Sequence, residues 1–139
     1  MKAKNESDFF LMSYPKSGRT WLRLMLGRVL EMHFNLKDTN ILALQKLREL
    51  HHDIPKIWVS HDDNPQLKKP DELVTSKAEY QDKRVILLVR DPRDAIVSSY
   101  YQKKKREKAY YGILTEFIRE EKGSFATLIA FYNIWAENR

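Results

Sequence analysis

Apolar residues in this chain fall into short continuous runs and helically spaced stripes, which alternate along the sequence. The runs over 9–12, 57–60 and 85–89 predict strands, the first ended abruptly by a Pro and Gly loop. The run over 85–89 is apolar at every position, which is typical of a parallel strand with helices on both faces. Strands interleaved with helical stripes predict an α/β fold, a P-loop-like parallel sheet flanked by helices.

Helices are predicted between and after these runs. From Arg19 onward, one apolar face at helical spacing comprises Leu22, Met25, Leu26, Val29 and Leu30. A second helix is expected over 41–50, capped by Thr39 or Asn40. A third starts at Pro92, with Asp91 as N-cap, and runs into the region 103–108. A fourth runs from Ser124 to about Asn138, and 62–82 is predicted to be mainly loop.

Size and composition narrow the class of protein. The chain has 139 residues, 42% of them apolar and 32% charged, and it has no Cys, which excludes disulfide scaffolds and thiolate chemistry. We expect a single domain over 1–139, cut short at its C-terminus, because the last helix runs to Arg139 without a closing strand. No signal peptide or membrane span is visible, so we expect a cytoplasmic protein without membrane partners.

A candidate phosphate loop follows the first strand. The segment from Ser13 to Thr20 nearly matches the pattern G-x-x-x-x-G-K-[ST], with Ser13 for the first Gly, Arg19 for the Lys, and a Lys inside the loop at 16. Backbone N–H groups at the start of a helix bind anions, and Lys16, Ser17 and Thr20 add side-chain donors. The alternative is a plain strand–turn–helix unit with an incidental Lys.

A second candidate anion site follows the strand at 85–89. Arg90 comes at the strand end, where its guanidinium could bind a phosphate through two hydrogen bonds. Ser98 lies two turns into the next helix. The alternative is a surface salt bridge between Arg90 and Asp94.

Together the two segments resemble the signatures of the soluble, cytosolic-type sulfotransferase family. Tyr14-Pro-Lys-Ser-Gly-Arg-Thr-Trp21 differs from the family loop Tyr-Pro-Lys-Ser-Gly-Thr-Thr-Trp only at Arg19, and Arg90 to Ser98 follows Arg-(Asp/Asn)-Pro-(Arg/Lys)-Asp-x-x-x-Ser. The resemblance implies the donor 3′-phosphoadenosine 5′-phosphosulfate. Its 5′ end would be bound by Lys16, Ser17, Gly18, Arg19, Thr20 and Trp21, and its 3′-phosphate by Arg90 and Ser98. In the family the loop Lys contacts the sulfate and the Trp stacks on adenine; otherwise Trp21 would be a core aromatic.

The resemblance also implies a catalytic base. His61 follows the strand at 57–60, and family members carry their catalytic His after such a strand in a Lys-Thr-His context, whereas here Val59 and Ser60 precede it. A lone strand-end His is otherwise structural. His33 is expected to cap a helix, and His51 and His52 to face solvent. The implied reaction is in-line sulfuryl transfer to a hydroxyl or amine acceptor, without a metal and without a metal-ligand cluster.

Positive charge is concentrated in one stretch. Residues 83–108 hold nine Lys and Arg against three acids, a net +6 that equals the charge of the whole chain. The run from Lys103 to Arg106 is either a solvated helix end, which we favour, or a patch that attracts an anionic nucleotide or an acidic acceptor.

Three other functions compete with sulfuryl transfer. A P-loop nucleotide kinase or NTPase would carry a Lys before Thr20 and an acidic metal ligand at a strand end. A nucleic-acid-binding domain would spread basic and aromatic residues over one surface, so no nucleic-acid partner is expected. An inactive nucleotide-binding fragment is the third. The acceptor itself cannot be inferred from these residues.

Overall fold

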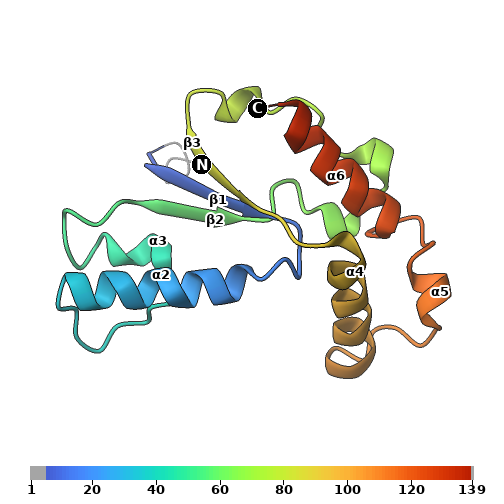
Figure 1. Cartoon of the computed structure of the whole chain (residues 1–139), viewed down its shortest axis with the longest axis horizontal. Helices are drawn as coiled ribbons and strands as arrows, with labels where there is room; N and C mark the ends of the chain where they lie inside the picture. The colour runs from blue at the N-terminus through green and yellow to red at the C-terminus, as the bar shows by residue number, and fades with distance from the viewer. Residues whose placement is uncertain (1–5, 139) are drawn as a thin grey trace.

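The structure, a computed structural model, describes residues 6–138 and has a three-stranded parallel sheet at its centre (Figure 1). The strands are β1 (Phe9–Ser13), β2 (Ile57–Ser60) and β3 (Arg84–Leu88), in the spatial order β2-β1-β3. In register, Leu11 of β1 lies opposite Val59 on one side and Ile86 on the other. The helices are α2 (Arg19–His33), α3 (Leu44–Leu47), α4 (Pro92–Tyr101), α5 (Leu114–Phe117) and α6 (Phe125–Glu137). The predicted α/β class with a parallel sheet is confirmed.

Alternate residues of β1 face two separate cores. Phe10 and Met12 pack against Leu128, Phe131 and Trp135 of α6. On the other face, Leu11 packs with Leu44 and Leu47 of α3 and with the α2 side chains of Leu22, Leu26 and Leu30. Helices α2 and α3 therefore cover one face of the sheet and α6 covers the other (Figure 1).

Two predictions about buried faces are wrong. Only Leu22, Leu26 and Leu30 of the predicted α2 stripe meet the core, while Met25 and Val29 are 58% and 63% exposed, because no described segment covers that flank of the helix. The run at 85–89 was expected to be buried on both faces, but β3 is an edge strand and Ile86 is 47% exposed. Helices α2 and α3 lie over β1 and β2 and leave β3 only partly covered.

Helix boundaries follow the local signals closely at two places. The Asp91 side chain accepts the Arg93 N–H and Pro92 opens α4, as predicted. Ser124 caps α6 by accepting the Thr127 N–H. The helix predicted over 41–50 shortens to α3, and 62–82 contains three short 3₁₀ turns, at 65–67, 70–72 and 78–80. Helix α4 continues into a π-helical turn over 102–106, and α5 was not predicted.

No helix within residues 6–138 is long and apolar enough to cross a membrane.

Candidate active site

The three predicted functional segments meet at one edge of the sheet. β1, β2 and β3 are parallel, so their carboxyl ends point the same way. The loop 14–18 leaves β1, His61 follows β2, and Arg90 lies two residues after β3. The carboxyl edge of an open α/β sheet is where ligands of this fold class bind.

The loop after β1 has the geometry of an anion cradle. Lys16 and Gly18 both have left-handed backbone conformations, with φ of 66° and 96°, and Gly18 leads directly into α2. Within residues 6–138, no side chain caps the start of α2, so its first N–H groups are available to an anion. The Lys16 ammonium donates to Gln102 Oε1 at 2.6 Å, so the end of α4 holds the Lys side chain.

The second segment contacts the first directly. Arg90 Nη1 donates to the Lys16 carbonyl oxygen at 3.1 Å, and Arg90 Nη2 lies 3.8 Å from Asp94 Oδ2. The salt bridge considered as an alternative is thus present but long, while the contact to the loop is a normal hydrogen bond. Ser98 and Lys16 line one cavity. The structure therefore brings Lys16, Arg90 and Ser98 together.

Tyr132 joins the two segments and was missed by the sequence analysis. The Tyr132 hydroxyl accepts a hydrogen bond from the Arg90 N–H at 3.1 Å and donates one to the Arg90 carbonyl oxygen at 3.2 Å. It also lies 3.3 Å from Ser17 Oγ. The buried Ser17 hydroxyl therefore faces α6. The sequence showed Tyr132 only as one aromatic residue among several in the last helix, and its polar role depends on a partner 115 residues away.

Both ring nitrogens of His61 are engaged. Nδ1 lies 2.9 Å from the Ser13 carbonyl oxygen, which can only accept, so Nδ1 carries the hydrogen. Nε2 therefore has a lone pair, and Arg19 Nη2 donates to it at 2.7 Å. Arg19, where the loop departs from the family pattern, thus contacts the candidate base, and its buried Nη1 has no hydrogen-bond partner.

The surroundings keep His61 neutral. Burial lowers the pKa of His61 below 6.5; the Ser13 carbonyl opposes this shift, and the positive charge of Arg19 adds to it. Burial, with the nearby charge of Arg23, also lowers the pKa of Arg19 below its usual value. At neutral pH the imidazole is in the form that accepts a proton.

The segment that carries His61 is tied to a buried ion pair. Asp62, Asp63 and Asn64 have φ of 46°, 58° and 49°, an unusual succession of left-handed residues. Asp62 lies 2.8 Å from the Lys77 ammonium, with both side chains almost fully buried, and accepts the Tyr80 hydroxyl at 2.9 Å. This network fixes the position of the chain immediately after His61.

Two other predicted loop residues face outward. Trp21 is 71% exposed, so it is not a core aromatic, and Thr20 is also exposed. The Arg93 guanidinium forms two hydrogen bonds with Asp91, which also accepts the Arg93 backbone N–H; together these bonds lower the pKa of Asp91 to about 2. Arg93 is therefore occupied by its neighbour and does not join the site.

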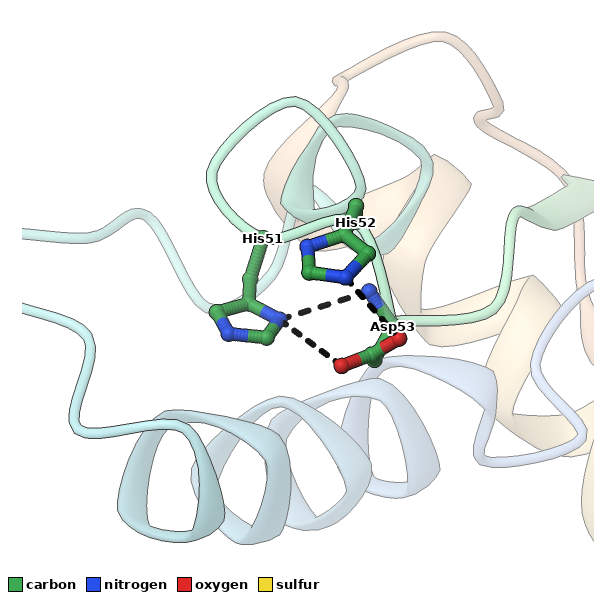
Figure 2. A group of neighbouring side chains, drawn as sticks. All are labelled: His51, His52 and Asp53. Carbon is green, nitrogen blue, oxygen red and sulfur yellow. Dashed lines mark hydrogen bonds and ion pairs between the residues drawn. The ribbon is translucent and has the colours of Figure 1, made fainter.

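One group of possible metal ligands exists in the described chain, which qualifies the expectation that there is none. The ligand atoms of His51, His52 and Asp53 lie within 4.8 Å of one another in the loop before β2 (Figure 2). However, His51 Nδ1 already accepts the Asp53 N–H at 3.3 Å, and His52 is 85% exposed. This loop is at the amino edge of the sheet, away from the phosphate loop.

These features define a class: an α/β protein whose strand ends carry an anion-binding loop, an arginine contacting that loop and a neutral histidine. The sequence matches the family described as sulfotransferase domain over residues 6–135, and the chain belongs to that family. Its members are transferase enzymes that move sulfuryl groups. The predicted family is confirmed. No solved structure matched the chain.

Proposed function

We propose that the chain transfers a sulfuryl group from 3′-phosphoadenosine 5′-phosphosulfate to the hydroxyl of a small-molecule acceptor, with His61 as general base. The observation that carries this proposal is the contact between the two anion-binding segments, in which Arg90 Nη1 donates to the Lys16 carbonyl at 3.1 Å. A nucleotide with charged groups at both its 5′ and 3′ positions needs its two anion-binding segments side by side, as this contact joins them.

The residues present suit the donor. The free N–H groups at the start of α2 and the Lys16 ammonium oppose negative charge at the 5′ end, including the charge that develops on the leaving oxygen. Arg90 and Ser98 would hold the 3′-phosphate, and exposed Trp21 offers its ring face to adenine. When bound, the donor supplies a sulfuryl group whose bond to the bridging oxygen breaks as the acceptor oxygen bonds to sulfur.

His61 would take the acceptor proton at Nε2. Its Nδ1 hydrogen is held by the Ser13 carbonyl, which fixes the tautomer and the ring orientation. In the structure, Arg19 donates a hydrogen bond to this Nε2 lone pair. Arg19 must therefore move before His61 can act, and the phosphosulfate anion next to the same loop is the natural new partner for its guanidinium.

The structure disfavours a magnesium-dependent NTPase. Such an enzyme needs a free carboxylate near the end of a strand, and the acids that follow β2 are Asp62 and Asp63. Asp62 is paired with Lys77, and Asp63 with Lys68 and the Val74 N–H. After β3, Asp91 is paired with Arg93, and Asp94 lies 3.8 Å from Arg90. Each of these four carboxylates therefore already has a cationic partner.

Calorimetric titration separates the competing functions. The protein should bind adenosine 3′,5′-bisphosphate more tightly than ATP with magnesium, and an oligonucleotide only weakly. Turnover is then measured with the phosphosulfate donor and a panel of phenol, alcohol, sugar and amine acceptors. Preferred binding of ATP with magnesium would replace the proposal with the NTPase alternative. Binding of the bisphosphate without turnover of any acceptor would leave the nucleotide-binding fragment.

A further inference from the structure

The basic run at 103–106 divides into two pairs with different surroundings. It forms the π-helical turn after α4, and such turns are frequent at functional sites. The Lys103 ammonium lies 5.1 Å from the centre of the Phe117 ring. Lys104 donates to the Tyr100 hydroxyl at 2.8 Å and to the Gly112 carbonyl at 3.0 Å. The fold thus uses the first two lysines to attach this turn to its neighbours.

Lys105 and Arg106 instead line a cavity of about 390 Å³. The other residues of its wall are Lys16, Ser98, Tyr101 and Gln102. Within residues 6–138, neither Lys105 nor Arg106 forms an ion pair with a carboxylate; Lys105 lies 5.0 Å from the centre of the Tyr101 ring. Three cations, Lys105, Arg106 and Lys16 from the phosphate loop, therefore line one cavity. A helix end that is only solvated does not require such an arrangement.

The turn is also connected to the phosphate loop. Gln102, its first residue, accepts a hydrogen bond from the Lys16 ammonium and donates to Glu107 Oε1, each at 2.6 Å. Gln102 therefore links the Lys16 ammonium to the turn that carries Lys105 and Arg106, and all four residues line the cavity. Whatever occupies the cavity therefore lies next to the group that contacts the transferred sulfuryl.

We propose that Lys105 and Arg106 form an anion subsite for the acceptor, so that the acceptor is a hydroxyl compound that also carries a carboxylate, phosphate or sulfate. This proposal rests on the proposed function. The charges of the nucleotide already have partners in Lys16, Arg90, Ser98 and the loop N–H groups. Lys16 and Ser98 form the donor's side of the cavity, which leaves the charges of Lys105 and Arg106 for a second anionic group. His61 does not line the cavity, so the cavity holds the charged part of the acceptor and not its reacting hydroxyl.

The test compares two acceptors that differ by one charge. Binding of 2-naphthol and of 6-hydroxy-2-naphthoate is measured by calorimetry in the presence of saturating adenosine 3′,5′-bisphosphate. The wild-type protein should bind the naphthoate at least about tenfold more tightly, because a carboxylate gains charge-assisted hydrogen bonds in the subsite. The variant Lys105→Gln/Arg106→Gln should lose that preference and keep its affinity for the bisphosphate. Both side chains are exposed, so the variant should fold.

Lys103→Gln is the matched control, because it removes one charge from the same run without changing the cavity wall. It should keep the naphthoate preference. Equal affinities of the wild type for the two naphthalenes, or no naphthoate binding at millimolar concentration, would overturn the subsite. A double variant that loses bisphosphate affinity would assign the two cations to the donor instead. If the wild type fails to bind the bisphosphate, the proposed function itself is wrong, whatever the naphthoate does.

Discussion

His61 and the pair His51–His52 show how one residue type acquires different properties at the two edges of a sheet. At the carboxyl edge, His61 is half-buried, both its nitrogens have partners, and its pKa is lowered by burial and Arg19. At the amino edge, the rings of His51 and His52 stack with their centres 5.0 Å apart, and both lie near the exposed carboxylate of Asp53 (Figure 2). The His51 ring also packs against Phe34.

The difference lies in what the strands bring together. Ser13 and His61 end adjacent parallel strands, so a backbone carbonyl from one strand orients the ring on the other. The helix that follows the first strand then supplies Arg19. Among the described residues, Phe34 is the one ring contact of His51 and His52 from outside their own loop, and His51 Nδ1 is occupied by the Asp53 N–H of the same loop.

Removing the imidazole at the carboxyl edge should have the largest effect. His61→Ala should lower kcat by about a thousandfold, since general-base catalysis contributes on this order, while the affinity for adenosine 3′,5′-bisphosphate stays nearly unchanged. Steady-state kinetics and calorimetry on the same preparation measure both. His51→Ala/His52→Ala is the control and should match the wild type. Equal turnover by His61→Ala would remove His61 from the mechanism.

Breaking the buried pair behind His61 should destabilise the protein. Asp62→Asn leaves the Lys77 ammonium buried without its counter-charge, which should cost about 3 kcal/mol of unfolding free energy in denaturant melts. Adding Lys77→Met should recover part of the loss because it removes the unpaired charge. Asp71→Asn, at an exposed position, is the control. A stability change in Asp62→Asn no larger than in this control would contradict the network.

Removing the Tyr132 hydroxyl from α6 should weaken nucleotide binding moderately. Tyr132→Phe removes the hydrogen bonds to the Arg90 backbone and to Ser17, each worth about 1 kcal/mol, so bisphosphate affinity should fall about tenfold. Tyr111→Phe, at an 85% exposed residue, is the matched control. Unchanged affinity in Tyr132→Phe would mean that the two anion-binding segments hold their positions without α6.

The smallest effect concerns pH. Because burial lowers the pKa of His61, kcat/KM should fall with acid only below pH 6.5. Arg19→Thr should raise this pKa slightly, because it removes the nearby positive charge, the smallest of the causes. Histidine NMR titration of the nucleotide-free protein reads this shift without any turnover. Arg28→Gln, far less buried and paired with Glu31, serves as control. A lower His61 pKa in Arg19→Thr would contradict the Arg19–His61 contact.

The lowered pKa of His61 also makes the free energy of unfolding depend on pH. The unfolded chain binds a proton to His61 more readily than the folded one, so this contribution to stability is present above about pH 6.5 and is lost as the pH falls through the folded-state pKa.

Local patterns predicted the elements that depend on nearby residues. The strands predicted at 9–12 and 57–60, the Asp91 cap with Pro92, and the start of the last helix at Ser124 are confirmed, because residues within a few positions determine them. The position of His61 beyond β2 and of Arg90 beyond β3 followed directly from those strands.

Exposure and long-range contacts could not be read the same way. Met25, Val29 and Ile86 are apolar residues at the right spacing, but whether something covers them depends on tertiary packing. The links from Arg19 to His61, from Lys16 to Gln102 and from Ser17 to Tyr132 join residues 42, 86 and 115 positions apart. Only the sheet order and the placement of α4 and α6 reveal them.

The claim that one nucleotide is held at both ends is tested most directly by a cycle of two ligands and two proteins. Adenosine 3′,5′-bisphosphate and adenosine 5′-monophosphate are titrated into the wild type and Arg90→Gln. Loss of the 3′-phosphate should weaken wild-type binding at least about tenfold, as expected for a charged hydrogen-bonded group, and should cost far less in Arg90→Gln. If removing the 3′-phosphate lowers the affinity equally in the wild type and in Arg90→Gln, Arg90 does not bind the 3′-phosphate.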